Sequence, residues 1–237
     1  MASLKNWDNQ TWLSSKEYIS SFTNFVLKQK KLTKNSSVLD IGCGRGKILE
    51  HISSKIKLVN KPIGIDVENH KDKSKKMIFK KGDGLNHIIN SKNTFDLIII
   101  KQAIHFFKTK QIIKLLSSCK NKLNPNGKIM ILSLDPKKND IPTFDLMNKK
   151  LRYSLIRDKK IFDLIYKTFS KIIIKSFLFK VSISKKKYLN MIEKKYISIL
   201  LNFNQREINI GLSEINHKYK KMIKFNDRLI CLILSKN

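Results

Sequence analysis

The chain has 237 residues, of which 41% are hydrophobic, so it can fill one core and is expected to form a single domain. No apolar run is long enough to span a membrane, the first residues lack the apolar centre of a secretion signal, and the three cysteines form no close pair, so we expect a cytoplasmic protein with neither a membrane span nor a metal site. The formal net charge of +31 predicts nonspecific attraction to polyanions, although the lysines that carry it are spread along the chain, as an AT-rich genome would also encode them.

The first segment, 1–35, is expected to be helical. Trp7, Trp12, Tyr18 and Phe22 recur at spacings that suit one or two amphipathic helices. Two roles are open for these aromatic side chains. They could form a flap over a bound ligand, or they could pack an N-terminal helix onto the core.

Strands and helices alternate from Ser37 onward. We expect strands at 37–41, 62–66, 77–83, 95–100 and 128–135, with helical stripes at 48–56 and 112–123 and a turn at LNPNG. This alternation predicts a parallel sheet with right-handed crossovers. Only ten residues, 67–76, join the second and third strands, so the helix expected there must be short or missing.

The pattern is looser after Asp135. We expect a helix at 143–157, a strand at 171–184, a mostly helical stretch from 188 to about 219, and a final strand at 228–234. In the helical stretch Tyr188, Tyr196 and Phe203 could either line a binding site or dock the stretch onto the rest of the chain.

The loop DIGCGRGK places glycines at Gly42, Gly44 and Gly46, directly after the first strand. It is not a Walker phosphate loop, because Ile48 stands where that motif needs serine or threonine. The dinucleotide fingerprint also fits poorly, because Lys47 occupies the place of its third glycine.

The residue types around this loop suit a zwitterionic sulfonium ligand better than a pyrophosphate. Glycines let the backbone approach a ligand closely, and the amides of a helix N-terminus can meet a carboxylate. Asp40, at the end of its strand, can face an ammonium group, and Asp66 could accept both hydroxyls of a ribose. Asp83, after the third strand, could bind an adenine amino group.

With these residues in place, the chain resembles the class I S-adenosylmethionine-dependent methyltransferases, in particular the small-molecule (type 11) group that includes trans-aconitate methyltransferase. Over residues 37–135, VLDIGCGRG is similar to the family's first motif, GID to its second, GDG to its third and FDLIIIKQAIHFF to its fourth, while LNPNGKIMIL is similar to the turn and strand that follow.

The resemblance implies a fold and a cofactor. The fold is an α/β, Rossmann-like three-layer sandwich whose seven-stranded sheet has the order 3-2-1-4-5-7-6 with the seventh strand antiparallel. Residues 36–136 would bind S-adenosyl-L-methionine, which leaves as S-adenosyl-L-homocysteine, and residues 137–237 would complete the sheet and carry a helical lid at about 185–222. The cofactor-binding residues implied by the matched motifs are Asp40, Gly42, Gly44, Gly46, Asp66, Asp83, Gly84 and Lys101.

Residues after the fourth strand normally face the acceptor, here from Lys101 to His105. His105 aligns with a histidine common in the small-molecule group and is a candidate general base, or else a structural histidine at the sheet edge. Lys101 could bind a carboxylate of the acceptor or lie near the cofactor's own carboxylate. No Asn/Asp-Pro-Pro-Tyr/Phe element and no Pro-Cys pair occur here, which argues against DNA amino-methylation and cytosine-C5 chemistry.

In-line methyl transfer to a small-molecule acceptor is the function that the resemblance implies. A tRNA or rRNA methyltransferase is an alternative favoured by the charge, although the fourth strand ends in Lys101 rather than an aspartate. A non-catalytic binding protein that keeps the fold is a second alternative, against which the intact glycines and Asp66 count. The identity of the acceptor and the oligomeric state stay open.

Overall fold

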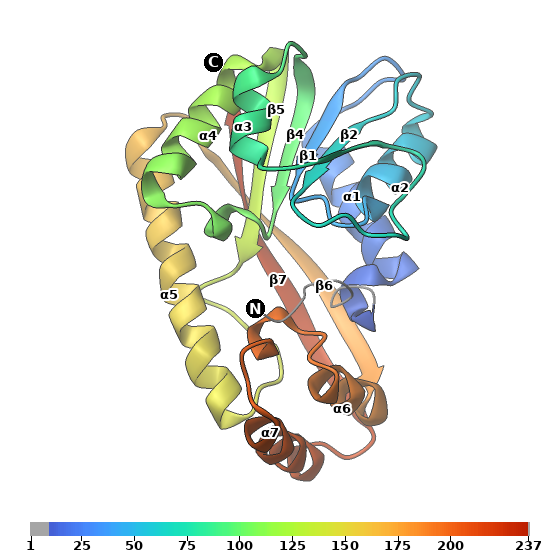
Figure 1. Cartoon of the computed structure of the whole chain (residues 1–237), viewed down its shortest axis with the longest axis vertical. Coiled ribbons are helices and arrows are strands. Elements are labelled where there is room, and N and C mark those ends of the chain that lie inside the picture. The colour runs from blue at the N-terminus through green and yellow to red at the C-terminus, as the bar shows by residue number, and fades with distance from the viewer. Residues whose placement is uncertain (1–9, 237) are drawn as a thin grey trace.

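The computed structural model describes residues 10–236 and contains a seven-stranded sheet with helices on both faces (Figure 1). The strands are β1 (Val38–Ile41), β2 (Ile63–Asp66), β3 (Ile78–Lys81), β4 (Phe95–Lys101), β5 (Leu123–Leu134), β6 (Ile173–Ser184) and β7 (Met222–Ser235). The helices are α1 (Lys16–Gln29), α2 (Lys47–Ile56), α3 (Gly84–Asn90), α4 (Thr109–Asn121), α5 (Asp145–Thr168), α6 (Lys185–Glu193) and α7 (Gln205–Lys218), with short 3-10 turns η2 (Trp12–Ser14), η3 (Ile104–Phe106) and η4 (Ser198–Leu200).

The strand order β3-β2-β1-β4-β5-β7-β6 confirms the expected topology. Strands β1 to β5 pair in parallel, and β7 runs antiparallel to both β5 and β6. The carboxyl ends of the parallel strands therefore meet at one rim of the sheet, which is where ligands bind in open α/β folds. In Figure 1 this rim faces the end of the molecule that carries α6 and α7.

Side chains of the central strands point alternately to the two faces of the sheet, and each face is covered by a layer of helices. In β4, Leu97 and Ile99 join the apolar core that contains side chains of α1 and α2, whereas Ile98 and Ile100 join the core formed with α3, α4 and α5. A strand buried on both faces is expected to be a continuous apolar run, as FDLIII is. The three-layer sandwich is confirmed.

The β2–β3 connection contains no helix among its described residues, as its length predicts. The charged sequence of this connection is typical of a solvated loop, and most of its side chains are exposed, but Arg45 in the glycine loop, for which the sequence favours a solvated position, is buried. Arg45 is 3% exposed, its Nε donates to Asp72 at 2.8 Å, and its carbonyl accepts from the amide of Ser74 at 2.9 Å. The side chain and the carbonyl of Arg45 together join the connection to the glycine loop.

Several element bounds differ from the predicted ones. Helix α3, which follows β3, was not expected, α5 continues past 157 to Thr168, and β7 begins at Met222 rather than at 228. The LNPNG turn lies inside β5, where it forms an irregularity with Asn126 in the left-handed region (φ 61°). Asparagine accepts this geometry at little cost.

Helices α6 and α7 and the turn η4 form the helical segment between β6 and β7 for which a lid is expected, and which is called the lid segment below; both strands extend beyond the other strands (Figure 1). Tyr188 and Phe203 are buried, the Tyr188 hydroxyl donates to the carbonyl of Pro142, and the Phe203 ring packs edge-on against Phe144. Of the two roles open for these side chains, Tyr188 and Phe203 therefore take the docking role. None of the helices between residues 10 and 236 has the length and apolarity of a membrane span.

Candidate functional site

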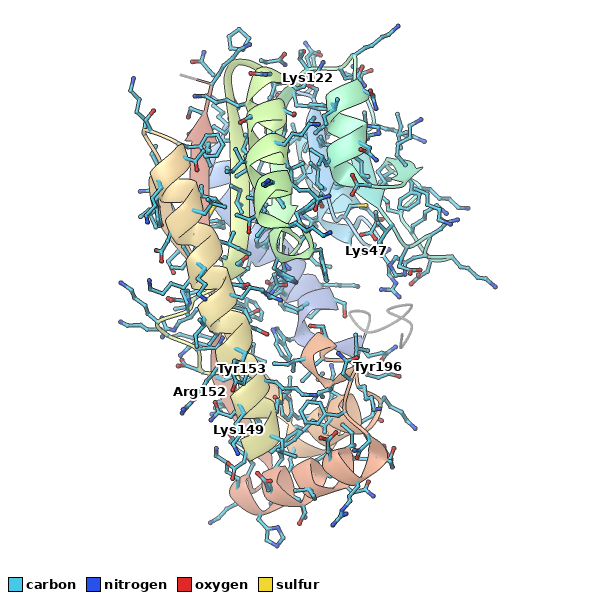
Figure 2. The ribbon with its side chains drawn as sticks, turned by 60° about the vertical axis from the view of Figure 1, so that its left-hand side comes forward. Lys47, Lys122, Lys149, Arg152, Tyr153 and Tyr196 are labelled. Carbon is cyan, nitrogen blue, oxygen red and sulfur yellow. The ribbon has the colours of Figure 1, made fainter. Side chains whose placement is uncertain are left out.

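The glycine loop connects β1 to α2 at the carboxyl rim of the sheet. Gly42, Gly44 and Gly46 have φ angles of 78°, 52° and 69°, so each needs the freedom that only glycine has at low cost. Gly46 is also the N-cap of α2, and the first amides of this helix have no hydrogen-bond acceptor within the helix. In Figure 2, Lys47 marks this helix start on the side of the body that faces Tyr196 of the lid segment, and Lys122 lies at the opposite end of the sheet.

Asp40 is buried at the end of β1, directly before this loop. It is 3% exposed, and its Oδ1 has no hydrogen-bond partner among the described residues. Burial raises the pKa of Asp40 to about 7, an effect that Asp66 increases and Lys101 opposes. A buried carboxylate oxygen without a partner costs free energy, and a positively charged ligand group would relieve that cost.

Asp66 ends β2 and lies against the glycine loop. Its Oδ2 accepts from the amide of Gly44 at 2.8 Å, and its Oδ1 accepts from the amide of Glu68 at 3.0 Å. Each oxygen has a second lone pair, so the carboxylate can still accept from two adjacent hydroxyls while the loop holds it in place.

Asp83 and Gly84 lie at the end of the neighbouring strand. The Oδ1 of Asp83 caps α3 by accepting from the amide of Asn86 at 2.9 Å. A Cβ at Gly84 would come within 2.4 Å of the Cγ2 of Ile41, so glycine lets α3 start against the end of β1. A hollow of about 350 Å³ beside Asp83 is lined in part by Ile65 and Asn86.

Lys101 ends β4, and its side chain is directed toward α1. Its Nζ lies 5.3 Å from the ring centre of Tyr18 and 5.5 Å from that of Phe22, and 3.3 Å from the Oε1 of Gln102. Burial lowers the pKa of Lys101, while Asp227 and Asp40 act to raise it. The ammonium therefore belongs to the same electrostatic cluster as Asp40.

His105 lies on η3, on the opposite side of β4 from α1. Its ring centre is 4.4 Å from that of Phe106, and its Nδ1 is buried without a partner among residues 10–236. Burial and the nearby Arg157 of α5 lower the pKa of His105 to about 4, so the imidazole is neutral near pH 7. The structure thus separates the two catalytic candidates, with Lys101 toward α1 and His105 toward α5.

Asp227 is a buried acid that the sequence patterns did not single out. It is 1% exposed, and its Oδ2 accepts from the Nε1 of Trp12 at 2.9 Å. Alternation along β7 could have identified it. Phe225, Asp227 and Leu229 occupy successive core-facing positions of the strand, and an acid at a core-facing position is a sign of a functional or paired carboxylate. Trp12 and Tyr18 are buried in the core, which favours the packing role over the flap, and Trp7 lies outside the described residues.

The structure therefore gathers Asp40, Asp66 and the three loop glycines at one rim, with Asp83 and Gly84 beside them on the next strand. Such a site offers an acceptor for an ammonium, amides for a carboxylate and a carboxylate for a diol. These are the polar groups of an amino-acid-bearing nucleoside.

Comparisons with known proteins agree with this arrangement. The family model described as "Methyltransferase domain" matches residues 12–165, from η2 into α5. Among curated proteins, "Putative methyltransferase 235L" of Invertebrate iridescent virus 6 is 31% identical over 156 residues, which cover 64% of this chain and 54% of that protein. The chain thus spans about half the length of this curated relative.

Solved structures share the fold. A "Putative methyltransferase from antibiotic biosynthesis pathway" of Anabaena variabilis ATCC 29413 superimposes with a TM-score of 0.59 at 17% identity, covering 89% of this chain and 95% of that one. The plantazolicin methyltransferase BpumL, in complex with a monoazolic desmethylPZN analog and SAH, gives a TM-score of 0.53 at 18% identity, covering 97% of this chain and 88% of that one.

Proposed function

Because the chain belongs to the Methyltransferase domain family, we propose that it is an S-adenosyl-L-methionine-dependent methyltransferase that acts on a small-molecule acceptor. The observation that carries the proposal is the unpartnered oxygen of the buried Asp40, next to three glycines in left-handed conformations. This combination suits a ligand that brings an ammonium group close to the backbone. The fold shared with a methyltransferase solved with SAH supports the same cofactor class.

Each residue of the rim would bind a different polar group of the cofactor. Asp40 would hold the ammonium, the first amides of α2 the carboxylate, and Asp66 the ribose hydroxyls. Asp83 uses one oxygen on α3 and keeps the other for the adenine amino group. When bound, S-adenosylmethionine supplies a methyl group on a positively charged sulfur, so the chain mainly has to orient the acceptor and exclude water.

His105 is the residue that we assign to the acceptor, because Lys101 is turned away toward α1. A neutral imidazole can accept a hydrogen bond from an acceptor N–H or O–H, but a pKa near 4 makes it a weak proton acceptor. The helices α6 and α7 lie at the end of the molecule that the rim faces (Figure 1), and we expect them to close over a small acceptor. Figure 2 shows Lys149, Arg152 and Tyr153 on the part of α5 nearest these helices. We further propose that the enzyme works in a reducing cytosol, which its three free cysteines support.

Transfer of label tests this function. The protein is incubated with S-adenosylmethionine labelled in the methyl group and with separate fractions of cellular small molecules, RNA and protein. The proposal expects label in the small-molecule fraction and none with Asp40→Asn. Label in RNA, persisting at salt concentrations that release bulk RNA, would favour the RNA alternative, and label in no fraction would favour a binding protein.

Asp66→Ala tests the ribose assignment. Removing the carboxylate is expected to weaken binding of S-adenosylhomocysteine by about 1–3 kcal/mol, because two hydroxyls lose their acceptor and the Gly44 amide loses its partner. The measurement is titration calorimetry, with Asp163→Asn on the exposed face of α5 as the control. Unchanged affinity in Asp66→Ala would reject the assignment.

A further inference from the structure

Lys101 and two buried carboxylates, Asp40 and Asp227, form one electrostatic cluster beside the proposed cofactor site. The Nζ of Lys101 lies against the aromatic rings of α1. Burial lowers the pKa of Lys101, while Asp227 and Asp40 act to raise it. No ion pair within 4.0 Å joins Lys101 to either of them in residues 10–236. Its polar contact is the Oε1 of Gln102 at 3.3 Å.

The buried carboxylates of this cluster differ in their partners. The Oδ1 of Asp40 has no hydrogen-bond partner among the described residues. Asp227 instead accepts from Trp12 and interacts with the Tyr18 hydroxyl, whose pKa burial and the Asp227 carboxylate raise. Unpartnered buried oxygens are rare in folded proteins because each costs free energy, so the oxygen of Asp40 is the one that still needs a cation.

The side of Asp227 is built to hold a cation. The rings of Tyr18 and Phe22 lie 5.3 Å and 5.5 Å from the Lys101 Nζ, within the range of cation–π attraction. The Nε1 of Trp12 fixes Asp227 by donating to its Oδ2 at 2.9 Å, and the Tyr18 hydroxyl interacts with the same carboxylate. The side of Asp40 has no such aromatic support in the cation–π contacts of the described chain.

We propose that Asp227 is a positioning residue of the cofactor site, which draws the Lys101 ammonium toward α1 and so keeps the free oxygen of Asp40 available to the ammonium of the cofactor. The proposal rests on the proposed function, because it needs a ligand with an ammonium group at Asp40. Without Asp227, Lys101 pairs with Asp40 and competes with that ligand.

The test is a double-mutant cycle of Asp227→Asn and Lys101→Met, with S-adenosylhomocysteine binding measured by calorimetry at pH 8. Asp227→Asn alone is expected to weaken binding about tenfold, because the ligand must displace an internal ion pair. In the Lys101→Met background the same change is expected to alter affinity less than about threefold, because the competing ammonium is gone. The isosteric asparagine keeps an oxygen for Trp12.

Two controls separate positioning from packing. Binding of 5′-methylthioadenosine, which has the nucleoside but no ammonium, is expected to be the same in Asp227→Asn and in the unmodified protein. Asp140→Asn removes a carboxylate that contacts Asn226 and Arg228, the neighbours of Asp227, and is expected to bind like the unmodified protein.

Three results would overturn the proposal: unchanged affinity in Asp227→Asn, an equal loss in both backgrounds, or loss of the cooperative unfolding transition in Asp227→Asn, which would make the residue part of the packing. Failure of the unmodified protein to bind S-adenosylhomocysteine would instead reject the proposed function.

Discussion

Replacing Asp40 by asparagine is expected to weaken binding of S-adenosylhomocysteine about 100-fold at pH 8. Asp40 is 3% exposed, and its Oδ1 has no partner among the described residues. A ligand ammonium would therefore gain a charged hydrogen bond in a buried site, which is stronger than a neutral one. Asparagine keeps the size of the side chain and removes the charge.

The same carboxyl group predicts a pH dependence of binding. Burial raises the pKa of Asp40 to about 7, and only the ionised form attracts an ammonium. Affinity is therefore expected to rise as the pH increases through 7, and at pH 6 to be about tenfold lower than at pH 8, because about one tenth of the carboxyl is ionised there. The ligand ammonium stays charged over this range.

Calorimetry at pH 6, 7 and 8 checks both statements. Asp40→Asn is expected to bind weakly and with little pH dependence between 6 and 8, whereas Asp163→Asn is expected to follow the unmodified protein. If Asp40→Asn retained the full affinity and the full slope, the ammonium of the ligand would have to lie elsewhere.

Gly42→Ala is expected to have the largest effect on stability, about 2–4 kcal/mol. Gly42 has a φ of 78°, and a Cβ there would lie 2.4 Å from the Cβ of Ala103. The alanine therefore suffers both a left-handed backbone and an overlap with the segment that follows β4. Because typical domains are stable by about 5–15 kcal/mol, this is a large share of the total.

Denaturant unfolding measures this loss of stability. Two further variants separate the contribution of backbone strain from that of the overlap with Ala103. Gly82 has a φ of 151° and nothing within 4 Å of an added Cβ, so Gly82→Ala reports backbone strain without overlap. Adding Ala103→Gly to Gly42→Ala removes the overlap and is expected to recover part of the loss. No recovery would mean that backbone strain alone limits Gly42.

The parallel half of the sheet could be predicted from the sequence because its signals are local. Val38–Ile41 and Phe95–Lys101 are short apolar runs with no alternative as helices, and the loop glycines identify the crossover after β1. The strand order itself came from the resemblance and is confirmed. The site residues at this rim remain proposals, although the structure brings Asp40 and Asp66 to the same loop.

The parts that were missed depend on contacts between distant segments. The fixed position of the β2–β3 connection depends on Arg45 and Asp72, 27 residues apart, and the role of Asp227 depends on Trp12, 215 residues away. Helix α3 has only seven residues, too few for a periodic apolar stripe. Composition and local spacing do not predict which distant residues pair, so these contacts could be identified only from the structure.

Equilibrium dialysis of the unmodified protein against S-adenosylmethionine labelled in the methyl group tests the central assignment most directly. Saturable binding of one ligand per chain, displaced by S-adenosylhomocysteine and lost in Asp40→Asn, is the predicted result. No saturable binding, or binding that Asp40→Asn leaves intact, would contradict the assignment of this rim to the cofactor.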